Sequence, residues 1–177
     1  MALKSLFKTY TGVILFIVKL LLSYTILSFF YRLYLKYYKD SVDGITYFVA
    51  KKSAAILEYF EYNVELITNF KGKTVALIVN DQLLSRVVEG CNAISVIILF
   101  TAFIIAFSGT FKHTVLYIMS GSIFIFSINI LRITLINMGL YHYPEHSAVL
   151  HDVIFPATIY GLVFLLWMFW LKLLKRT

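Results

Sequence analysis

Four long apolar segments most strongly constrain how this chain of 177 residues can fold. They cover about residues 13–33, 91–108, 114–138 and 153–171. At about 1.5 Å per residue, each segment is long enough to cross a hydrocarbon core about 30 Å thick as a helix. Composition agrees, because only 14% of the residues are charged, against about 25% in a soluble domain. The sequence therefore predicts an all-α multi-pass membrane protein with about four transmembrane helices.

The charges outside these segments predict an orientation. The N-terminal flank, the link that contains Lys112 and the C-terminal tail are basic and contain no acid, whereas all nine acidic residues lie within 32–90 and 139–152. Because basic flanks remain on the cytoplasmic side, we expect both termini in the cytoplasm and the two acidic segments outside the cell membrane. Topology thus accounts for the net charge of +7, and we expect no nucleic-acid partner.

Residues 34–90 are expected to form a small extracytoplasmic α+β insert, a cap of one helix and a hairpin. Apolar residues recur at helical spacing between 45 and 60. Two runs rich in valine and leucine, 73–79 and 83–88, are separated by Asn80-Asp81, which is typical of a hairpin turn. The predicted organisation has three parts: an N-terminal transmembrane anchor at 1–33, the cap at 34–90 and a three-helix membrane core at 91–177.

Three side chains suited to catalysis occur in the predicted core. Arg132 lies inside the third apolar segment, where a guanidinium costs about 2.5–3.5 kcal/mol and therefore raises a functional-site hypothesis. Cys91, the only cysteine, begins the second segment, and His151 comes just before the fourth. If the helices alternate in direction, all three residues lie near the outer face of the membrane.

These residue types suit a cysteine nucleophile. A thiol needs a base or a cation to become a thiolate near neutral pH. A histidine can take its proton and return it to a leaving amine, and an arginine can stabilise the thiolate or an oxyanion. We expect His151 as the general base rather than His142 or His146, because the helix that follows it fixes its direction and depth. Each residue also has a structural interpretation: Cys91 as a small buried hydrophobe, Arg132 reaching outward to the headgroups, and His151 at the membrane interface.

A metal site is a weaker interpretation of the outer loop. His142, His146, His151 and Glu145 offer ligand atoms, but their spacing does not follow the tight pattern of zinc sites. The sequence contains no HExxH, GxSxG or CxxC motif and no nucleotide-binding glycine loop. We therefore expect neither a metal nor another cofactor.

Three short motifs resemble the exosortase/archaeosortase family. They are Glu89-Gly90-Cys91-Asn92-Ala93, Asn129-Ile130-Leu131-Arg132 and His151-Asp152, and they are most similar to the small F-type exosortase-like proteins. The resemblance implies a membrane-embedded cysteine transpeptidase or protease. Such an enzyme cleaves the C-terminal sorting signal of exported proteins at the outer face of the cell membrane, through a cysteine thioester. Cys91, Arg132 and His151 would be the catalytic residues, and 91–177 the catalytic core.

The resemblance also implies the partners, which are the lipid bilayer and an exported protein with a C-terminal transmembrane sorting signal. Transpeptidation and hydrolysis both stay open, as does the oligomeric state. The alternative is a non-catalytic membrane assembly or scaffold protein. In that protein, Arg132 would have a structural role and pair with Glu89 or Asp152.

Overall fold

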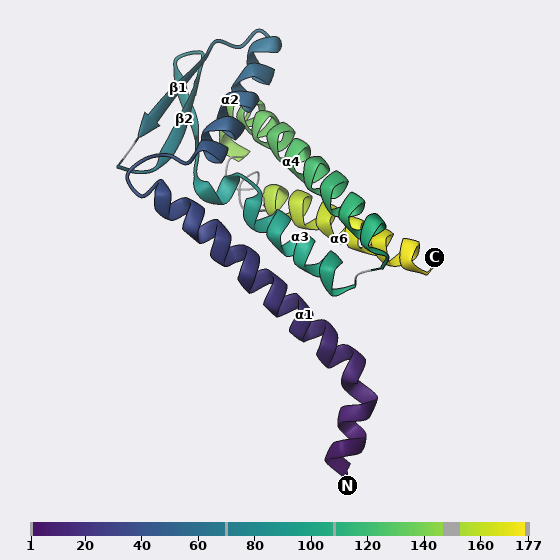
Figure 1. Ribbon diagram of the computed structural model, residues 1–177. Helices are drawn as coiled ribbons and strands as arrows, with labels where there is room; N and C mark the ends of the chain where they lie inside the picture. The colour runs from purple at the N-terminus through teal and green to yellow at the C-terminus, as the bar shows by residue number, and fades with distance from the viewer. Residues whose placement is uncertain (1, 70, 108, 147–152, 176–177) are drawn as a thin grey trace.

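The computed structural model describes residues 2–69, 71–107, 109–146 and 153–175. It is mostly helical, with one small sheet (Figure 1). In chain order the elements are α1 (Ala2–Tyr37), α2 (Gly44–Tyr59), β1 (Val64–Asn69), β2 (Thr74–Val79), β3 (Gln82–Val87), η1 (Glu89–Cys91), α3 (Ile94–Ala106), α4 (Phe111–His142), η2 (Pro144–His146) and α6 (Phe155–Leu174).

The elements form a cap and a set of long helices. The sheet and α2 lie together at one end, and α1, α3, α4 and α6 extend away from them (Figure 1). Both chain termini and the connection between α3 and α4 lie away from the cap (Figure 1). The acidic insert and the three basic segments therefore lie at opposite ends of the molecule, while the orientation in the membrane stays a prediction.

Among the described residues, three helices are long and apolar enough to cross a membrane, namely Tyr10–Tyr37, Phe111–His142 and Pro156–Leu174. In place of the second predicted span, 91–108, the structure has α3 with only 13 residues. This helix is about 20 Å long at about 1.5 Å per residue, which is shorter than a core of about 30 Å. Three of the four predicted spans thus correspond to helices that are long and apolar enough to cross a membrane, and the second corresponds to the shorter α3.

The short length of α3 has a local cause in the residues before it. Ala93 adopts a left-handed backbone conformation with φ of 64°, and a helix cannot continue through such a residue. The side-chain oxygen of Asn92 accepts a hydrogen bond from the backbone N–H of Ile94 at 3.0 Å. This bond satisfies one of the N–H groups that a helix start leaves unpaired. The chain therefore begins its helix at Ile94 rather than at Cys91.

The helix and the hairpin predicted for the cap are both present. Asp43 caps α2, because its carboxylate accepts hydrogen bonds from the backbone N–H groups of Ile45 and Thr46. β2 and β3 form the hairpin, and β1 pairs antiparallel with the other edge of β2 to give the order β1-β2-β3. β1 was not predicted, although Val64 and Leu66 alternate with more exposed residues.

One face of the sheet packs against α2 and α4. This core brings the base of the cap against the C-terminal half of α4, and β3 packs beside that helix. Its buried members come from α2, β2, β3 and α4, and they are Val49, Ala50, Leu57, Val75, Leu77, Val79, Val87 and Ile133.

A second core joins α3, α4 and α6. Gly121 allows the close approach of α4 to α3, because a Cβ atom there would collide with the ring of Phe100. α1 lies along α3, where the rings of Phe16 and Phe107 are 4.3 Å apart between centroids. The buried members of this core are Ala93, Phe100, Ile104, Ile125, Val163 and Trp170.

Candidate active site

Cys91 lies where the cap meets the membrane helices. It ends η1, between β3 and α3, and its side chain is half-buried. The next residue, Asn92, is buried, and its Nδ2 donates hydrogen bonds to the Tyr31 hydroxyl at 2.8 Å and to Thr46 Oγ1 at 3.2 Å. Bonds from Asn92 to α1, α2 and the start of α3 therefore hold the backbone beside the thiol.

A buried asparagine of α4 also contacts the backbone of Cys91. Nδ2 of Asn129 donates a hydrogen bond to the Cys91 carbonyl oxygen at 2.8 Å. Asn129 lies one turn before Arg132, and residues three apart share one face of a helix. In the sequence, Asn129 begins the motif that ends at Arg132, and no role was predicted for it. The spacing of three residues from Arg132 was the signal that it faces the same site.

Cys91 and Arg132 line one cavity of about 200 Å³. The two residues come from η1 and α4, which are far apart in the sequence. The walls of the cavity come from β3, η1, α4 and the start of α6, and the remaining lining residues are Ser85, Arg86, Val87, Ile133, Ile136, Asn137 and Pro156.

A second cavity of about 250 Å³ adjoins Arg132 on α4. Apart from Arg132 and Thr158 its lining is aliphatic, and it includes Ile154 at the approach to α6. Arg132 thus borders both cavities, with Cys91 in one and mostly aliphatic side chains in the other. A guanidinium in such a position can bind a polar group of a ligand at the edge of an apolar region.

A sequence profile of the family described as transmembrane exosortase matches residues 4–173. The chain belongs to the transmembrane exosortase family. No curated protein and no solved structure matches it. The resemblance seen in the three motifs is therefore confirmed for the family, while similarity to the F-type members stays a prediction. Membership also supports a membrane protein with a role in protein sorting.

The third predicted catalytic residue of this exosortase, His151, lies outside the described residues, as does Asp152. The described chain resumes at Val153, directly after them. Two residues near that point line the cavities beside Arg132, namely Ile154 in the aliphatic cavity and Pro156 in the cavity of Cys91. The beginning of α6 therefore lies next to both cavities.

The other two histidines considered as the general base, His142 and His146, lie at the end of α4 and in η2. Nε2 of His142, in the last turn of α4, is 2.8 Å from the Tyr62 hydroxyl of the cap. His146 lies in η2 with Glu145. Within 2–69, 71–107, 109–146 and 153–175, no three His, Cys, Asp or Glu residues come together as metal ligands.

Glu89, one of the two structural partners considered for Arg132, lies elsewhere. Its carboxylate is beside the hydroxyl of Tyr31 on α1. Among the described residues no ion pair joins Glu89 to Arg132. Of the two partners considered for Arg132, Glu89 therefore forms no ion pair with it, and Asp152 lies outside the described residues.

Proposed function

We propose that the protein is a cysteine transpeptidase or protease that cleaves the C-terminal sorting signal of exported proteins. The reaction takes place at the outer face of the cell membrane, through a thioester on Cys91. The observation that carries the proposal is the cavity shared by Cys91 and Arg132, which come from different elements and meet where the cap joins the helices. Membership of the exosortase family supports the sorting role.

The proposed reaction has two stages. In the first, His151 accepts the thiol proton of Cys91 as the sulfur attacks the carbonyl carbon of the scissile peptide bond. Arg132 stabilises the negative charge of the thiolate and of the carbonyl oxygen. When the C–N bond breaks, His151 gives the proton to the leaving amine, and the acyl group stays on the sulfur as a thioester. In the second stage, an amine or water attacks the thioester and Cys91 leaves as a thiol again.

The depth of the site supports cleavage near one surface of the membrane. Asn129 holds the Cys91 carbonyl, and it lies about 27 Å along α4 from Phe111 at about 1.5 Å per residue. A hydrocarbon core is about 30 Å thick. With the start of α4 at the inner surface, the thiol is close to the outer one, where a tethered substrate leaves its own transmembrane helix.

Cysteine labelling in intact cells tests the orientation. We expect a Lys52→Cys variant, in the cap, to react with a membrane-impermeant maleimide, because the cap is on the outer side. A Lys112→Cys variant, in the α3–α4 connection, should react only after the cells are opened. Both substitutions are made with Cys91→Ala, which leaves no other thiol. The opposite result would place the site on the cytoplasmic side and contradict the proposal.

The function itself is tested by mass spectrometry of the C-terminal peptides of exported proteins. We expect proteins that end in a transmembrane helix to lose that end in cells with the wild-type protein and to keep it with Cys91→Ala. Ser127→Ala, an exposed position of α4 outside the Cys91 cavity, is the matched control and should process normally. A processed protein should also be found as an acyl adduct on Cys91. Normal processing by a well-expressed Cys91→Ala variant would favour the scaffold interpretation.

A further inference from the structure

The strand that leads to Cys91 is an edge of the cap sheet. β3 pairs with β2 on one side, and no other strand of the described chain pairs with its second side. An edge strand presents backbone N–H and C=O groups that a further extended chain can pair with. Proteins that bind extended peptides often use such an edge, and the added peptide becomes another strand.

The free edge of β3 borders the cavity of Cys91 and Arg132. Three consecutive residues of β3, Ser85, Arg86 and Val87, line that cavity. Because successive side chains of a strand point to opposite faces, a cavity that touches all three lies along the backbone edge.

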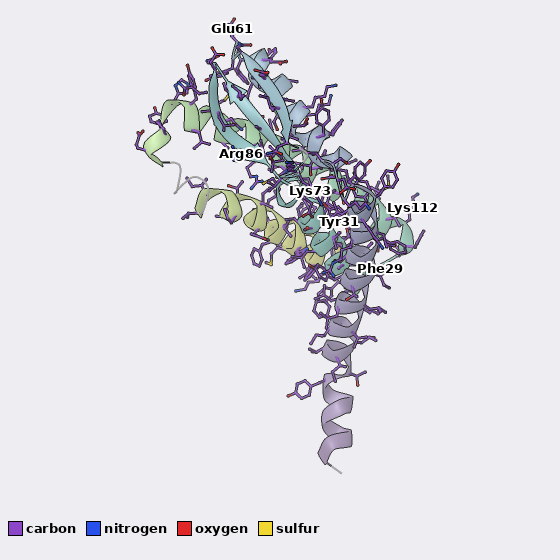
Figure 2. The ribbon with its side chains drawn as sticks, turned by 90° about the vertical axis from the view of Figure 1, so that its left-hand side faces the viewer. Phe29, Tyr31, Glu61, Lys73, Arg86 and Lys112 are labelled. Atoms are coloured by element: carbon purple, nitrogen blue, oxygen red, sulfur yellow. The ribbon has the colours of Figure 1, made fainter. Side chains whose placement is uncertain are left out.

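The side chains of these three residues confirm that they alternate between the two faces. Val87 is buried in the cap core, and Ser85 Oγ donates a hydrogen bond to Asn137 Oδ1 of α4 at 2.7 Å. Arg86 is exposed, and it lies toward the helix end of the sheet, far from Glu61 at the tip of the cap (Figure 2). A cavity that all three residues border therefore lies at the edge of the sheet, where β3 pairs with no further strand of the described chain.

The irregular part of the sheet lies directly before the three residues of β3 that line the cavity. The pairing of β2 with β3 shifts by one residue between Leu77 and Ile78, which leaves Leu84 as the extra residue of a bulge. From Ser85 to Val87 the register is continuous, and it ends four residues before Cys91. Bulges at sheet edges often lie beside functional sites, where they end one pairing and redirect the strand.

We propose that the extended segment of the exported substrate just outside its transmembrane helix adds to the edge of β3 as a parallel strand. This inference rests on the proposed function. β3 runs from the tip of the cap toward α3, and the substrate segment likewise runs from outside toward its own membrane helix. The added strand delivers the scissile bond to the end of β3, where Cys91 and Arg132 face it. Backbone pairing supplies binding that does not depend on the side chains of the segment.

Disulfide cross-linking tests the pairing and its direction. Because Cys91 is the only cysteine, Cys91→Ala is a thiol-free background in the full-length protein. A single cysteine is introduced on the strand, as Arg86→Cys or Val88→Cys, both at exposed positions. Each variant is paired with substrate proteins that carry one cysteine at successive positions of the extended segment. The probe is an exported protein whose C-terminal processing depends on Cys91. Ile67→Cys, at an exposed position of β1, the opposite edge strand, is the matched control.

We expect cross-links from Arg86→Cys at every second position of the segment, about tenfold above the Ile67→Cys control, because paired strands alternate with a period of two. From Val88→Cys the same pattern should move two residues toward the membrane helix, as parallel pairing requires. Cross-links without this period, or equal yields from β1, would overturn strand addition while leaving Cys91-dependent processing intact. If no exported protein depends on Cys91 for processing, both proposals fall.

Discussion

Replacing Asn129 with alanine tests whether its bond to the Cys91 carbonyl positions the nucleophile. Asn129 is buried and donates to that oxygen at 2.8 Å. We expect the variant to form the Cys91 thioester about 10²-fold more slowly, because a displacement of about 1 Å at a reacting group costs about that factor. The Asn129 side chain is not one of the reacting groups. A decrease in rate of this size would therefore show that the hydrogen bond positions the backbone at Cys91.

The accompanying loss of stability is too small to explain such a decrease in rate. A hydrogen bond contributes about 1 kcal/mol net in soluble proteins and about 0.6 kcal/mol between membrane helices. Native proteins are stable by about 5–15 kcal/mol, so nearly all molecules of the variant stay folded. A hundredfold slower reaction corresponds to about 2.7 kcal/mol in the activation free energy. This exceeds the free energy of the lost bond, and displacement of the thiol accounts for the difference.

Thr134→Ala is the matched control for Asn129→Ala. Thr134 is buried on the same helix, and its hydroxyl donates to the backbone of Ile130 at 3.1 Å rather than to Cys91. The assay combines thermal unfolding in detergent with single-turnover formation of the thioester, followed by mass spectrometry. Both variants should lose similar stability, and only Asn129→Ala should react slowly. If the two variants react at the same rate, the bond from Asn129 does not position the thiol.

Three further predictions concern the reaction and the packing. Arg132→Gln should lower the rate of thioester formation about 10²–10³-fold. Arg132→Lys should lower it less, because lysine keeps the charge but lacks the planar guanidinium group. Equal activity of Arg132→Gln and wild type would show that the arginine takes no part in the mechanism. His151→Ala should lower processing about 10²-fold or more, whereas His142→Ala should keep most of it, and equal losses would contradict the choice of base. Gly121→Ala should reduce both accumulation in the membrane and the unfolding temperature, because the added Cβ collides with a phenyl ring of α3. Gly161→Ala should behave as wild type, because no atom lies within 4 Å of a Cβ added there.

The elements that could be predicted depend on neighbours in the sequence. α1, α4 and α6 follow from long apolar segments, and the hairpin of β2 and β3 follows from a two-residue turn between apolar runs. α2 follows from the helical spacing of its apolar residues. Each of these signals lies within one segment, so it can be recognised without knowing what the segment packs against.

The differences from prediction arise where a backbone detail or a distant partner decides. α3 is short because Ala93 has a left-handed backbone, a conformation that its residue type does not indicate. β1 has a weak alternation of its own, and its pairing with β2 stabilises it as a strand. α4 continues to His142, beyond the predicted end of its span at 138, and its last turn contacts the cap, where Nε2 of His142 lies 2.8 Å from the Tyr62 hydroxyl.

The sequence by itself determined the membrane class, the positions of the long helices, the helix and hairpin of the cap, the family and the residue types available for catalysis. These depend on hydropathy, charge and short motifs, which are local properties. Only the tertiary structure decided that Cys91 and Arg132 line one cavity, that Asn129 holds the Cys91 backbone and that the edge of β3 borders the same space. Those contacts join segments far apart in the chain, and their geometry follows from how α4 packs against the cap and α3 rather than from any single segment.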